Sequence, residues 1–198
     1  MDRNIRQSIK TFVRHAFAAG ICVIVVISGR VASAETDAVD IPVDLANKLR
    51  PPITKDGALD TPFFDAKKAE ITLKSLKGEG IVMNFWATWC APCVREMPAL
   101  DNLAKKLEGT GVRILAVSED RKALNKVPPF FAANNIKNLA LYYDERAELS
   151  RKLGVSGLPT TVLIHADGTV AGRVLGVLEW DSPEVVQYLV QTLRPKTP

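Results

Sequence analysis

The sequence contains few of the residues that bind metals or form disulfides. Three cysteines and two histidines occur among its 198 residues. One of each lies in the first 34 residues, so the rest of the chain keeps only Cys90, Cys93 and His165. A tetrahedral zinc site needs four ligands, and this set does not supply them. No metal site is therefore predicted.

The sequence also lacks an apolar run of comfortable membrane-spanning length. The run at residues 16–28 has 13 residues, whereas a spanning helix takes about 20. It follows a basic leader and precedes Ala-Ser-Ala at 32–34, a small-x-small pattern that signal peptidases read. Residues 1–34 are predicted to be an export signal, with an uncleaved anchor as the alternative. Either places the remaining chain in a bacterial periplasm, soluble or anchored by an N-terminal helix.

Beyond residue 34 the chain has no net charge. Of the 26 basic and 22 acidic residues, five and one lie in residues 1–34, which leaves 21 of each sign. The overall charge of +4 is thus a property of the export segment. A neutral domain has no electrostatic attraction for polyanions. Nucleic acid is therefore not predicted as a partner, and membrane contact is predicted only through an uncleaved residue 1–34 segment.

Residues 61–195 are predicted to form one α/β domain. The runs at 81–87 and 112–117 are almost continuously apolar, as strands buried on both faces are. After the first run, apolar residues recur every three or four places up to Leu107, which predicts a helix. Strand–helix units leading into a hairpin and a last helix indicate a central mixed β-sheet flanked by helices on both faces.

The remaining segments give further predictions. Residues 35–60 contain three prolines, show no sustained period and are predicted to be a loosely held lead-in. The other predicted elements are a short hairpin at 62–73, a helix at 121–135 interrupted by Pro128 and Pro129, a strand at 139–142, a helix at 145–153, a hairpin at 160–175 turning at Asp167-Gly168, and a helix opened by Ser182.

The two cysteines lie where the first buried strand gives way to its helix. A C-x-x-C at that junction of a strand–helix pattern is the thioredoxin arrangement. Residues 84–98, Asn-Phe-Trp-Ala-Thr-Trp-Cys-Ala-Pro-Cys-Val-Arg-Glu-Met-Pro, resemble the active-site stretch of the TlpA-like (ResA-like) exported thioredoxin-fold proteins. The similarity continues through residues 157–161 and 179–180 and covers most of residues 60–195. It implies a thioredoxin fold with an N-terminal hairpin extension, thiol–disulfide oxidoreductase activity, and no cofactor beyond the redox-active disulfide.

The chemistry of such a pair requires a thiolate. Cys90 is predicted at the helix start, where unpaired N–H groups and the positive end of the helix dipole lower the pKa of a thiol. Cys93 lies one turn later and can resolve a mixed disulfide. We therefore predict Cys90 as an exposed attacking nucleophile and Cys93 as the resolving thiol. A structural staple is the alternative, although closing so short a loop stabilises by only about 2 kcal/mol.

The resemblance also assigns roles around the cysteines. It implies that Pro159 is a cis-proline beside the sulfurs and that the preceding carbonyl, from Leu158, receives the extended backbone of a client. Glu96 occupies the place of a nearby acid in the ResA-like branch, whereas thioredoxins proper carry an acid at the position of Asn84. A buried Glu96 with a raised pKa could take the proton of the resolving thiol. A solvated surface charge, paired for example with Arg95, is the alternative.

Several aromatic and polar residues have weaker assignments. Trp89 and Pro92 are predicted to contact the client, and Trp89 and Trp86 to wall the site, with simple core packing as the alternative for Trp86. The sequence suggests no role for Glu179 or Trp180, although both match the family. His165 is predicted to lie at the surface.

The residues between the cysteines predict the direction of exchange. Ala91-Pro92 lacks the polar or cationic group with which strong oxidases stabilise the reduced thiolate. We therefore predict a reductant that a membrane thiol-relay protein keeps reduced. The resemblance implies clients with cysteine pairs, such as apocytochrome c or the cysteines of oxidase copper sites and their assembly factors.

Two other functions use related sequences. A copper-binding oxidase-assembly module would need softer and wider-spaced ligands, such as C-x-x-x-C with a distant histidine. A thiol peroxidase carries its reactive cysteine after Pro-x-x-x-Thr-x-x-Cys, and residues 84–90 contain no proline. Both remain alternatives that the spacing disfavours.

Overall fold

The computed structural model describes residues 40–195. The predicted export segment, residues 1–34, lies outside this range, and so do the first residues of the predicted lead-in. Among residues 40–195, no helix combines the length and the apolar character that crossing a membrane requires.

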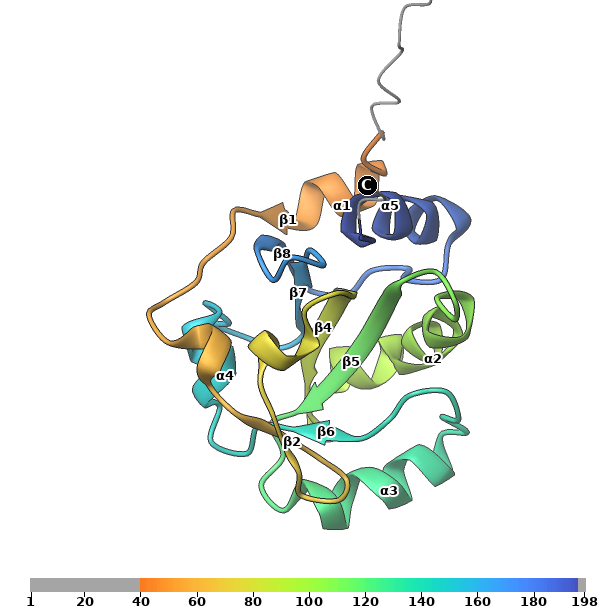
Figure 1. The fold of residues 1–198 in the computed structure, drawn as a ribbon. Helices are drawn as coiled ribbons and strands as arrows, with labels where there is room; N and C mark the ends of the chain where they lie inside the picture. The colour runs from red at the N-terminus through yellow and green to blue at the C-terminus, as the bar shows by residue number, and fades with distance from the viewer. Residues whose placement is uncertain (1–39, 196–198) are drawn as a thin grey trace, which may run out of the picture. The chain divides into compact units, whose positions relative to one another are not determined.

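A mixed sheet of eight strands forms the centre of the fold, in the order β1-β8-β7-β4-β5-β6-β2-β3 (Figure 1). β4 pairs parallel with β5 and antiparallel with β7. β5 pairs parallel with β6, and the other neighbours are antiparallel. The strands are β1 (Leu49–Arg50), β2 (Phe63–Asp65), β3 (Glu70–Ile71), β4 (Gly80–Trp86), β5 (Val112–Ser118), β6 (Tyr142–Tyr143), β7 (Thr160–Ile164) and β8 (Val170–Leu175).

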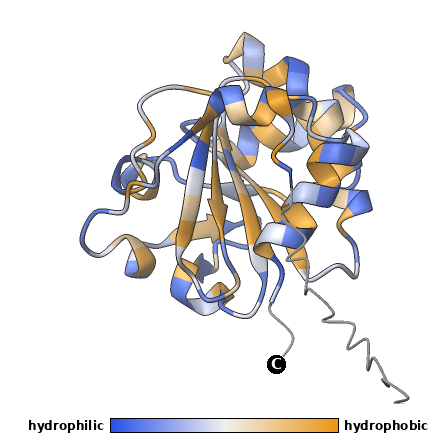
Figure 2. Cartoon of the chain, turned by 90° about the horizontal axis from the view of Figure 1, so that it is seen from above, coloured by the Kyte–Doolittle hydropathy of each residue, from blue (hydrophilic) through white to orange (hydrophobic). Residues whose placement is uncertain are grey.

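Helices cover both faces of this sheet. They are α1 (Val43–Lys48), α2 (Ala91–Lys106), α3 (Ala123–Ala133), α4 (Glu148–Lys152) and α5 (Pro183–Leu193), with short 3₁₀ turns η1 (Ala58–Asp60) and η2 (Leu73–Leu76). One buried cluster joins α1, α2, α3 and α5 to the sheet, and a second joins α4, η1 and η2 to the opposite face. Figure 2 shows the strands as the hydrophobic centre between helices with polar outer sides. The predicted architecture is confirmed.

Strand β4 contributes alternately to the two clusters. All seven of its residues are buried, as predicted. Val82 and Trp86 face the α2 side, whereas Ile81, Met83 and Phe85 face the α4 side. Because side chains alternate along a strand, Asn84 also faces α2. This placement brings a buried amide under the helix that carries the cysteines.

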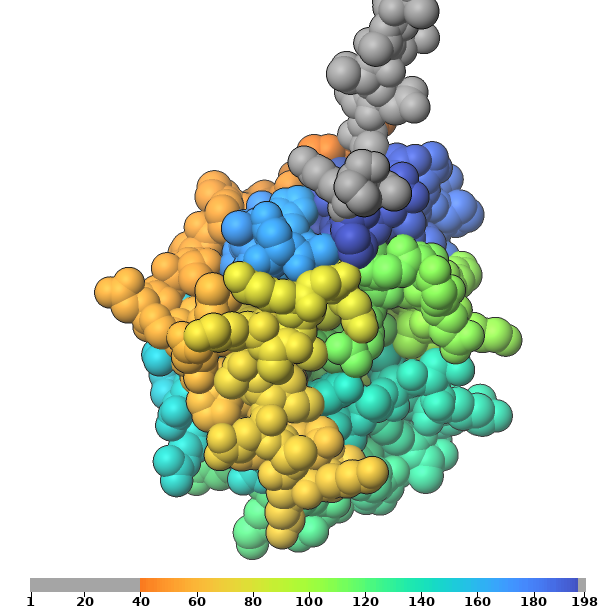
Figure 3. Space-filling view, viewed as in Figure 1, coloured from red at the N-terminus to blue at the C-terminus, as the bar shows by residue number. Residues whose placement is uncertain are grey.

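The prediction of a loosely held lead-in was wrong for residues 43–50. They form α1 and β1, and Leu45 is fully buried in the core. Leu49 and Arg50 pair with Val174 and Arg173 at the edge of the sheet. In the space-filling view, the orange-to-yellow residues from 40 to about 80 cover much of the face turned to the reader (Figure 3). A six-residue helix and a two-residue strand are too short to produce a readable period.

Three other elements, α3, β6 and α4, differ from the predictions. Helix α3 continues through Pro128 and Pro129 instead of breaking there. The phenylalanines that follow them, Phe130 and Phe131, pack their rings on Trp86, and this tertiary contact holds the helix despite two missing N–H donors.

The third predicted strand and the helix after it are displaced along the chain. β6 occupies 142–143 rather than 139–142, and α4 begins at Glu148 rather than at residue 145. The Asp144 carboxylate accepts the backbone N–H groups of Glu148 and Ser150, which fixes the later start of α4. The predicted hairpins β2–β3 and β7–β8 and the Ser182 cap of α5 are confirmed.

Candidate functional site

The two cysteines lie at the first turn of α2, directly after β4. Cys90 is the N-cap residue of α2, and its sulfur accepts the backbone N–H of Cys93 at 3.3 Å. The two residues form a disulfide with a Cα–Cα distance of 5.3 Å. The N-terminal end of a helix presents free N–H groups and a partial positive charge. A sulfur at Cys90 is therefore placed where a negative charge is stabilised.

The two sulfur-bearing residues differ in their access to solvent. Cys93 is fully buried, whereas 6% of the surface of Cys90 is accessible. The prediction of an exposed Cys90 was therefore wrong, because only this small part of its surface is accessible. Cys90, unlike Cys93, lines a cleft of about 680 Å³.

The walls of this cleft come from four parts of the chain. They are residues 89–92 around the cysteine, Glu119 after β5, the α4 region and the segment before β7. Trp89 is 68% exposed at its edge. The predicted client-contacting residues Trp89, Pro92 and Leu158 thus share one cleft with Cys90. Its lining is Trp89, Cys90, Ala91, Pro92, Glu119, Ala147, Ser150, Arg151, Val155, Ser156, Gly157 and Leu158.

The Leu158–Pro159 peptide bond is cis, as the resemblance implied. Pro159 itself is buried, and its carbonyl accepts the N–H of Gly176 at 3.0 Å. Because Thr160 starts β7, next to β4 in the sheet, this segment lies beside the strand that leads to Cys90.

Glu96 is buried, with 2% of its surface accessible. Its Oε1 accepts an N–H of Asn84 Nδ2 at 3.0 Å, and its Oε2 accepts the indole N–H of Trp180 at 3.0 Å. Burial raises the pKa of Glu96 to about 7, although these two hydrogen bonds and one from the backbone of Leu178 oppose the rise. The alternative of a solvated surface charge is therefore wrong.

Asn84 connects this acid to the sheet. Its Nδ2 also donates to Thr161 Oγ1 at 3.0 Å, whereas its Oδ1 is buried without a hydrogen-bond partner among the described residues. Trp180 was the residue for which the sequence suggested no role. It is fully buried beside α2, and its contact with Glu96 joins positions 84 residues apart, which no local sequence pattern reveals.

Asp120 holds the loop that leads into Cys90, and sequence reasoning missed it. Its fully buried carboxylate accepts the Thr88 N–H at 2.7 Å, the Thr88 hydroxyl at 2.8 Å and the Ser118 hydroxyl at 3.0 Å. Lys126 Nζ lies 3.5 Å from the same group. A polar Ser-Glu-Asp segment directly after a buried strand was the available signal, since that edge of a parallel sheet collects functional residues.

Glu119 is a second acid that the sequence did not point to. It lines the cleft with Cys90, and its Oε1 is buried without a partner in residues 40–195. Burial raises the pKa of Glu119, a hydrogen bond with Ser150 lowers it, and the nearby Asp144 carboxylate raises it further.

Two predicted positions need correction. Trp86 does not wall the site, because it is fully buried and stacks on Phe131 at 5.8 Å between ring centroids. His165 is half-buried rather than a plain surface residue, and its Nδ1 lies 3.0 Å from the Thr192 carbonyl oxygen. Residues 40–195 contain no group of three metal-ligating side chains that could hold an ion.

The known proteins to which this chain is similar are redox and thiol–disulfide exchange proteins. A family model described as Redoxin matches residues 46–189. The thiol-disulfide oxidoreductase ResA of Bacillus thuringiensis subsp. konkukian (strain 97-27) is 35% identical over 125 residues, which are 63% of this chain and 70% of that protein. The protein of the same name from Bacillus subtilis (strain 168) is 35% identical over 122 residues, 60% of this chain and 67% of its own. A solved structure, described as a putative thiol:disulfide interchange protein DsbE from Chlorobium tepidum, is similar with a TM-score of 0.60 and 26% identity, and the match covers 72% of this chain and 97% of that one.

Proposed function

The chain belongs to the Redoxin family, and from that membership we propose that it is an extracytoplasmic thiol–disulfide oxidoreductase that reduces the disulfides of client proteins through Cys90 and Cys93. The unequal access of the two cysteines carries this proposal. Only Cys90 reaches the cleft, and it does so at a helix N-cap. The Cys90 sulfur is therefore available to a client, and the buried Cys93 sulfur, one helical turn later, can attack only the Cys90 sulfur.

Reduction of a client proceeds in two exchanges. In the reduced protein, the Cys90 thiolate attacks one sulfur of the client disulfide, forms a bond to it and releases the other client sulfur as a thiolate. Cys93 then loses its proton and attacks the Cys90 sulfur. The Cys90–Cys93 bond forms, the mixed disulfide breaks, and the second client thiolate leaves and takes up a proton. Two electrons pass from the cysteine pair to the client.

Glu96 is the acceptor for the Cys93 proton. It lies one turn after Cys93 on the same face of α2, is buried with it, and has a pKa of about 7. A base with a pKa near the working pH is the most effective proton acceptor. Full burial of Cys93 excludes bulk water as an easy alternative.

The cleft supplies the contacts that orient the client. The exposed ring of Trp89 and the edge of Pro92 cover the side chains next to the client disulfide. Leu158 lines the same cleft from the segment before β7, and the buried Pro159 follows it through the cis peptide bond. In this arrangement the Leu158 carbonyl accepts a backbone N–H of the client.

The direction follows from the environment of Cys90. Between the cysteines, Ala91 and Pro92 provide no polar or cationic group that would stabilise the reduced form as strongly as in a potent oxidase. The protein therefore acts as a reductant, and a membrane thiol-relay protein restores its dithiol. Apocytochrome c and the cysteine pairs of oxidase copper sites are the proposed clients.

The position of His165 argues against the copper-binding alternative. It follows Ile164, which pairs with Ile81 near the start of β4, whereas Cys90 lies beyond the other end of that strand, after Trp86. The five residue steps from Ile81 to Trp86 alone span about 16 Å of extended chain. His165 therefore does not complete a copper site with Cys90 and Cys93.

Trapping tests the proposal. A Cys93→Ala variant, expressed with its export segment, is expected to accumulate mixed disulfides through Cys90, and mass spectrometry of these adducts identifies the clients. The Cys90→Ala variant is the matched control and is expected to trap almost none. Equal trapping by both variants, or none by either, contradicts the proposed roles. A reduction potential above that of the glutathione couple would reverse the proposed direction.

A further inference from the structure

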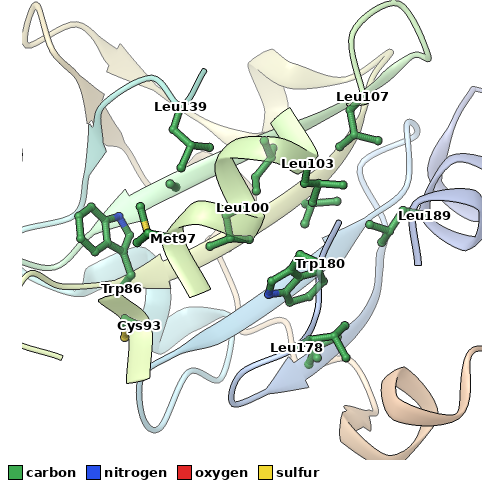
Figure 4. Packing of buried hydrophobic residues seen from close by; sticks show 14 of the residues in the cluster. Trp86, Cys93, Met97, Leu100, Leu103, Leu107, Leu139, Leu178, Trp180 and Leu189 are labelled. Carbon is green, nitrogen blue, oxygen red and sulfur yellow. The ribbon is translucent and has the colours of Figure 1, made fainter. Parts of the chain in front are cut away.

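The two oxygens of Glu96 have chemically different partners. Oε2 accepts the indole N–H of Trp180, and Oε1 accepts an N–H of the Asn84 amide, both at 3.0 Å. Trp180 packs in the same buried cluster as Cys93 and Met97 (Figure 4). The backbone of Leu178 gives the same carboxylate a further hydrogen bond. This arrangement suits an ionised Glu96, because each oxygen receives a donor.

The partners respond differently when Glu96 takes up a proton. An indole nitrogen is a donor only, so Trp180 cannot accept a hydrogen bond from a proton on Oε2, and protonation there would weaken the oxygen that accepts the indole N–H. An amide has a donor end and an acceptor end, and a half-turn exchanges them. The acceptor end of Asn84, Oδ1, is buried and has no partner among the described residues.

We infer that Trp180 and Asn84 are positioning residues that select the oxygen of Glu96 on which the proton is carried. Trp180 keeps Oε2 as an acceptor in both states, so the proton is taken up at Oε1. The Asn84 amide then turns, and its Oδ1 accepts the new O–H. Thr161 follows this change, because its hydroxyl accepts from Nδ2 in one state and donates to Oδ1 in the other.

No charged side chain within ion-pair distance of Glu96, among the described residues, favours one of its oxygens, so the hydrogen bonds decide which oxygen is protonated. The partner from strand β4, Asn84, is neutral, and so is Thr161 of β7, which contacts that amide rather than Glu96 itself. No ion pair within 4.0 Å involves Glu96 in the described part of the chain. The charged side chains that line the shallow hollow beside it are Asp44 and Lys48 from α1, Arg95 from α2, and Glu179 from the segment after β8.

The inference rests on the proposed function, since it names the atom that receives the Cys93 proton. It is tested in the oxidised protein, where the disulfide leaves no thiol to titrate in residues 35–198 and no client is needed. The pKa of Glu96 is followed by ¹³C NMR of the glutamate side-chain carboxyl carbons, and the Glu96→Gln variant assigns the signal.

The chain offers a matched pair of variants. Trp180 and Trp86 are both fully buried, but the indole N–H of Trp86 has no hydrogen-bond partner among residues 40–195. Trp180→Phe is expected to raise the pKa of Glu96 by about one unit or more, because a donor to the ionised form is lost. Trp86→Phe is expected to leave it unchanged. Equal shifts in both variants would overturn the role of Trp180.

Asn84→Leu separates the two positioning residues. Because the amide serves both protonation states, its removal is expected to move the pKa of Glu96 by less than half the Trp180→Phe shift. A shift as large as that of Trp180→Phe overturns the amide turn. In the unaltered protein, the Asn84 side-chain N–H₂ and Trp180 indole N–H signals are expected to change with the pKa of Glu96, which tests the idea even if a variant fails to fold. If neither signal changes while Glu96 titrates, the inference is wrong.

Activity is measured separately, as exchange with a model disulfide. Normal exchange with no effect of Trp180→Phe on the Glu96 pKa refutes the inference and leaves the proposed function standing. The expected shift in a protein whose Cys90 does not exchange refutes the proposed function alone.

Discussion

Two buried carboxylates flank the turn that carries Cys90, and they are built differently. Asp120 accepts three hydrogen bonds from Thr88 and Ser118 and has a lysine, Lys126, at 3.5 Å. Glu96 accepts N–H donors on both oxygens but has no cation within ion-pair distance in residues 40–195. Both are almost inaccessible to solvent.

These surroundings determine what each carboxylate is suited to do. A buried charge with a cation and several short hydrogen bonds is a fixed anchor, because removing it leaves its donors unpaired. A buried acid with neutral donors alone keeps a high pKa and can exchange its proton. Asp120 thus fixes the loop before Cys90, and Glu96 is free to change its charge behind Cys93.

The largest expected effect is the loss of the anchor. Asp120→Ala leaves the Thr88 N–H and two hydroxyls without their acceptor, and we expect the free energy of unfolding to fall by about 3–5 kcal/mol. Urea denaturation at pH 7 measures this change. Asp60→Ala is the control, because the Asp60–Lys74 pair is about two-thirds exposed and its loss is expected to matter little. If Asp120→Ala changed the free energy of unfolding as little as Asp60→Ala, Asp120 would not be a structural anchor distinct from Glu96.

Replacing Glu96, in contrast, is expected to raise the free energy of unfolding above neutral pH. Its folded-state pKa, about 7, lies above the ordinary value of 4.5. Between these pH values the folded protein binds more protons than the unfolded chain, so stability falls as pH rises through that range. Glu96→Gln removes this dependence and is expected to be more stable than the parent at pH 8 by up to about 3 kcal/mol.

The same variant is expected to lose function while it gains stability. Without the proton acceptor, release of the client from Cys90 is expected to slow about 100-fold or more. Urea denaturation at pH 5 and pH 8 and the lifetime of the mixed disulfide measure the two effects. A stability curve for Glu96→Gln that runs parallel to that of the parent would show that Glu96 does not titrate in this range.

The smallest expected effect concerns the cation itself. The Lys126 side chain is 48% exposed, so its pairing with Asp120 is weakened by solvent and salt. Lys126→Met is expected to lower the free energy of unfolding by less than about 1 kcal/mol. Urea denaturation at low and high salt measures it. A loss as large as that of Asp120→Ala would mean that the cation, rather than the Thr88 and Ser118 donors, makes the anchor.

Strand β4, the β7–β8 hairpin and the cysteine turn could be predicted from the sequence because their signals are local. The run at 81–87 is apolar throughout and leads directly into Cys90, and the Asp167-Gly168 turn joins two alternating strands. The lead-in could not be predicted in the same way. Leu45 and Leu49 belong to a core cluster that also holds residues of α2, α5 and β8, and Leu49 pairs with Val174 of β8, all distant in sequence.

The polar framework of the site was predictable only in part. Glu96 could be proposed from its distance to Cys93 along one helix. Trp180 and the adjacent pair Glu119 and Asp120 reach the site from two separate segments, and their partners become visible only once the sheet brings those segments together. For Trp86 the error was the opposite one. Its place in the motif predicted a site residue, but it packs in the core against Phe131.

A final consequence follows from the burial of Cys93. Because Cys90 is the only one of the two cysteines that lines the cleft, a protein that takes electrons from the pair and a protein that delivers them must both dock over this residue. They cannot do so at the same time. Turnover is therefore expected to follow a ping-pong order, in which each partner competitively inhibits the other and the enzyme alternates between two stable free forms.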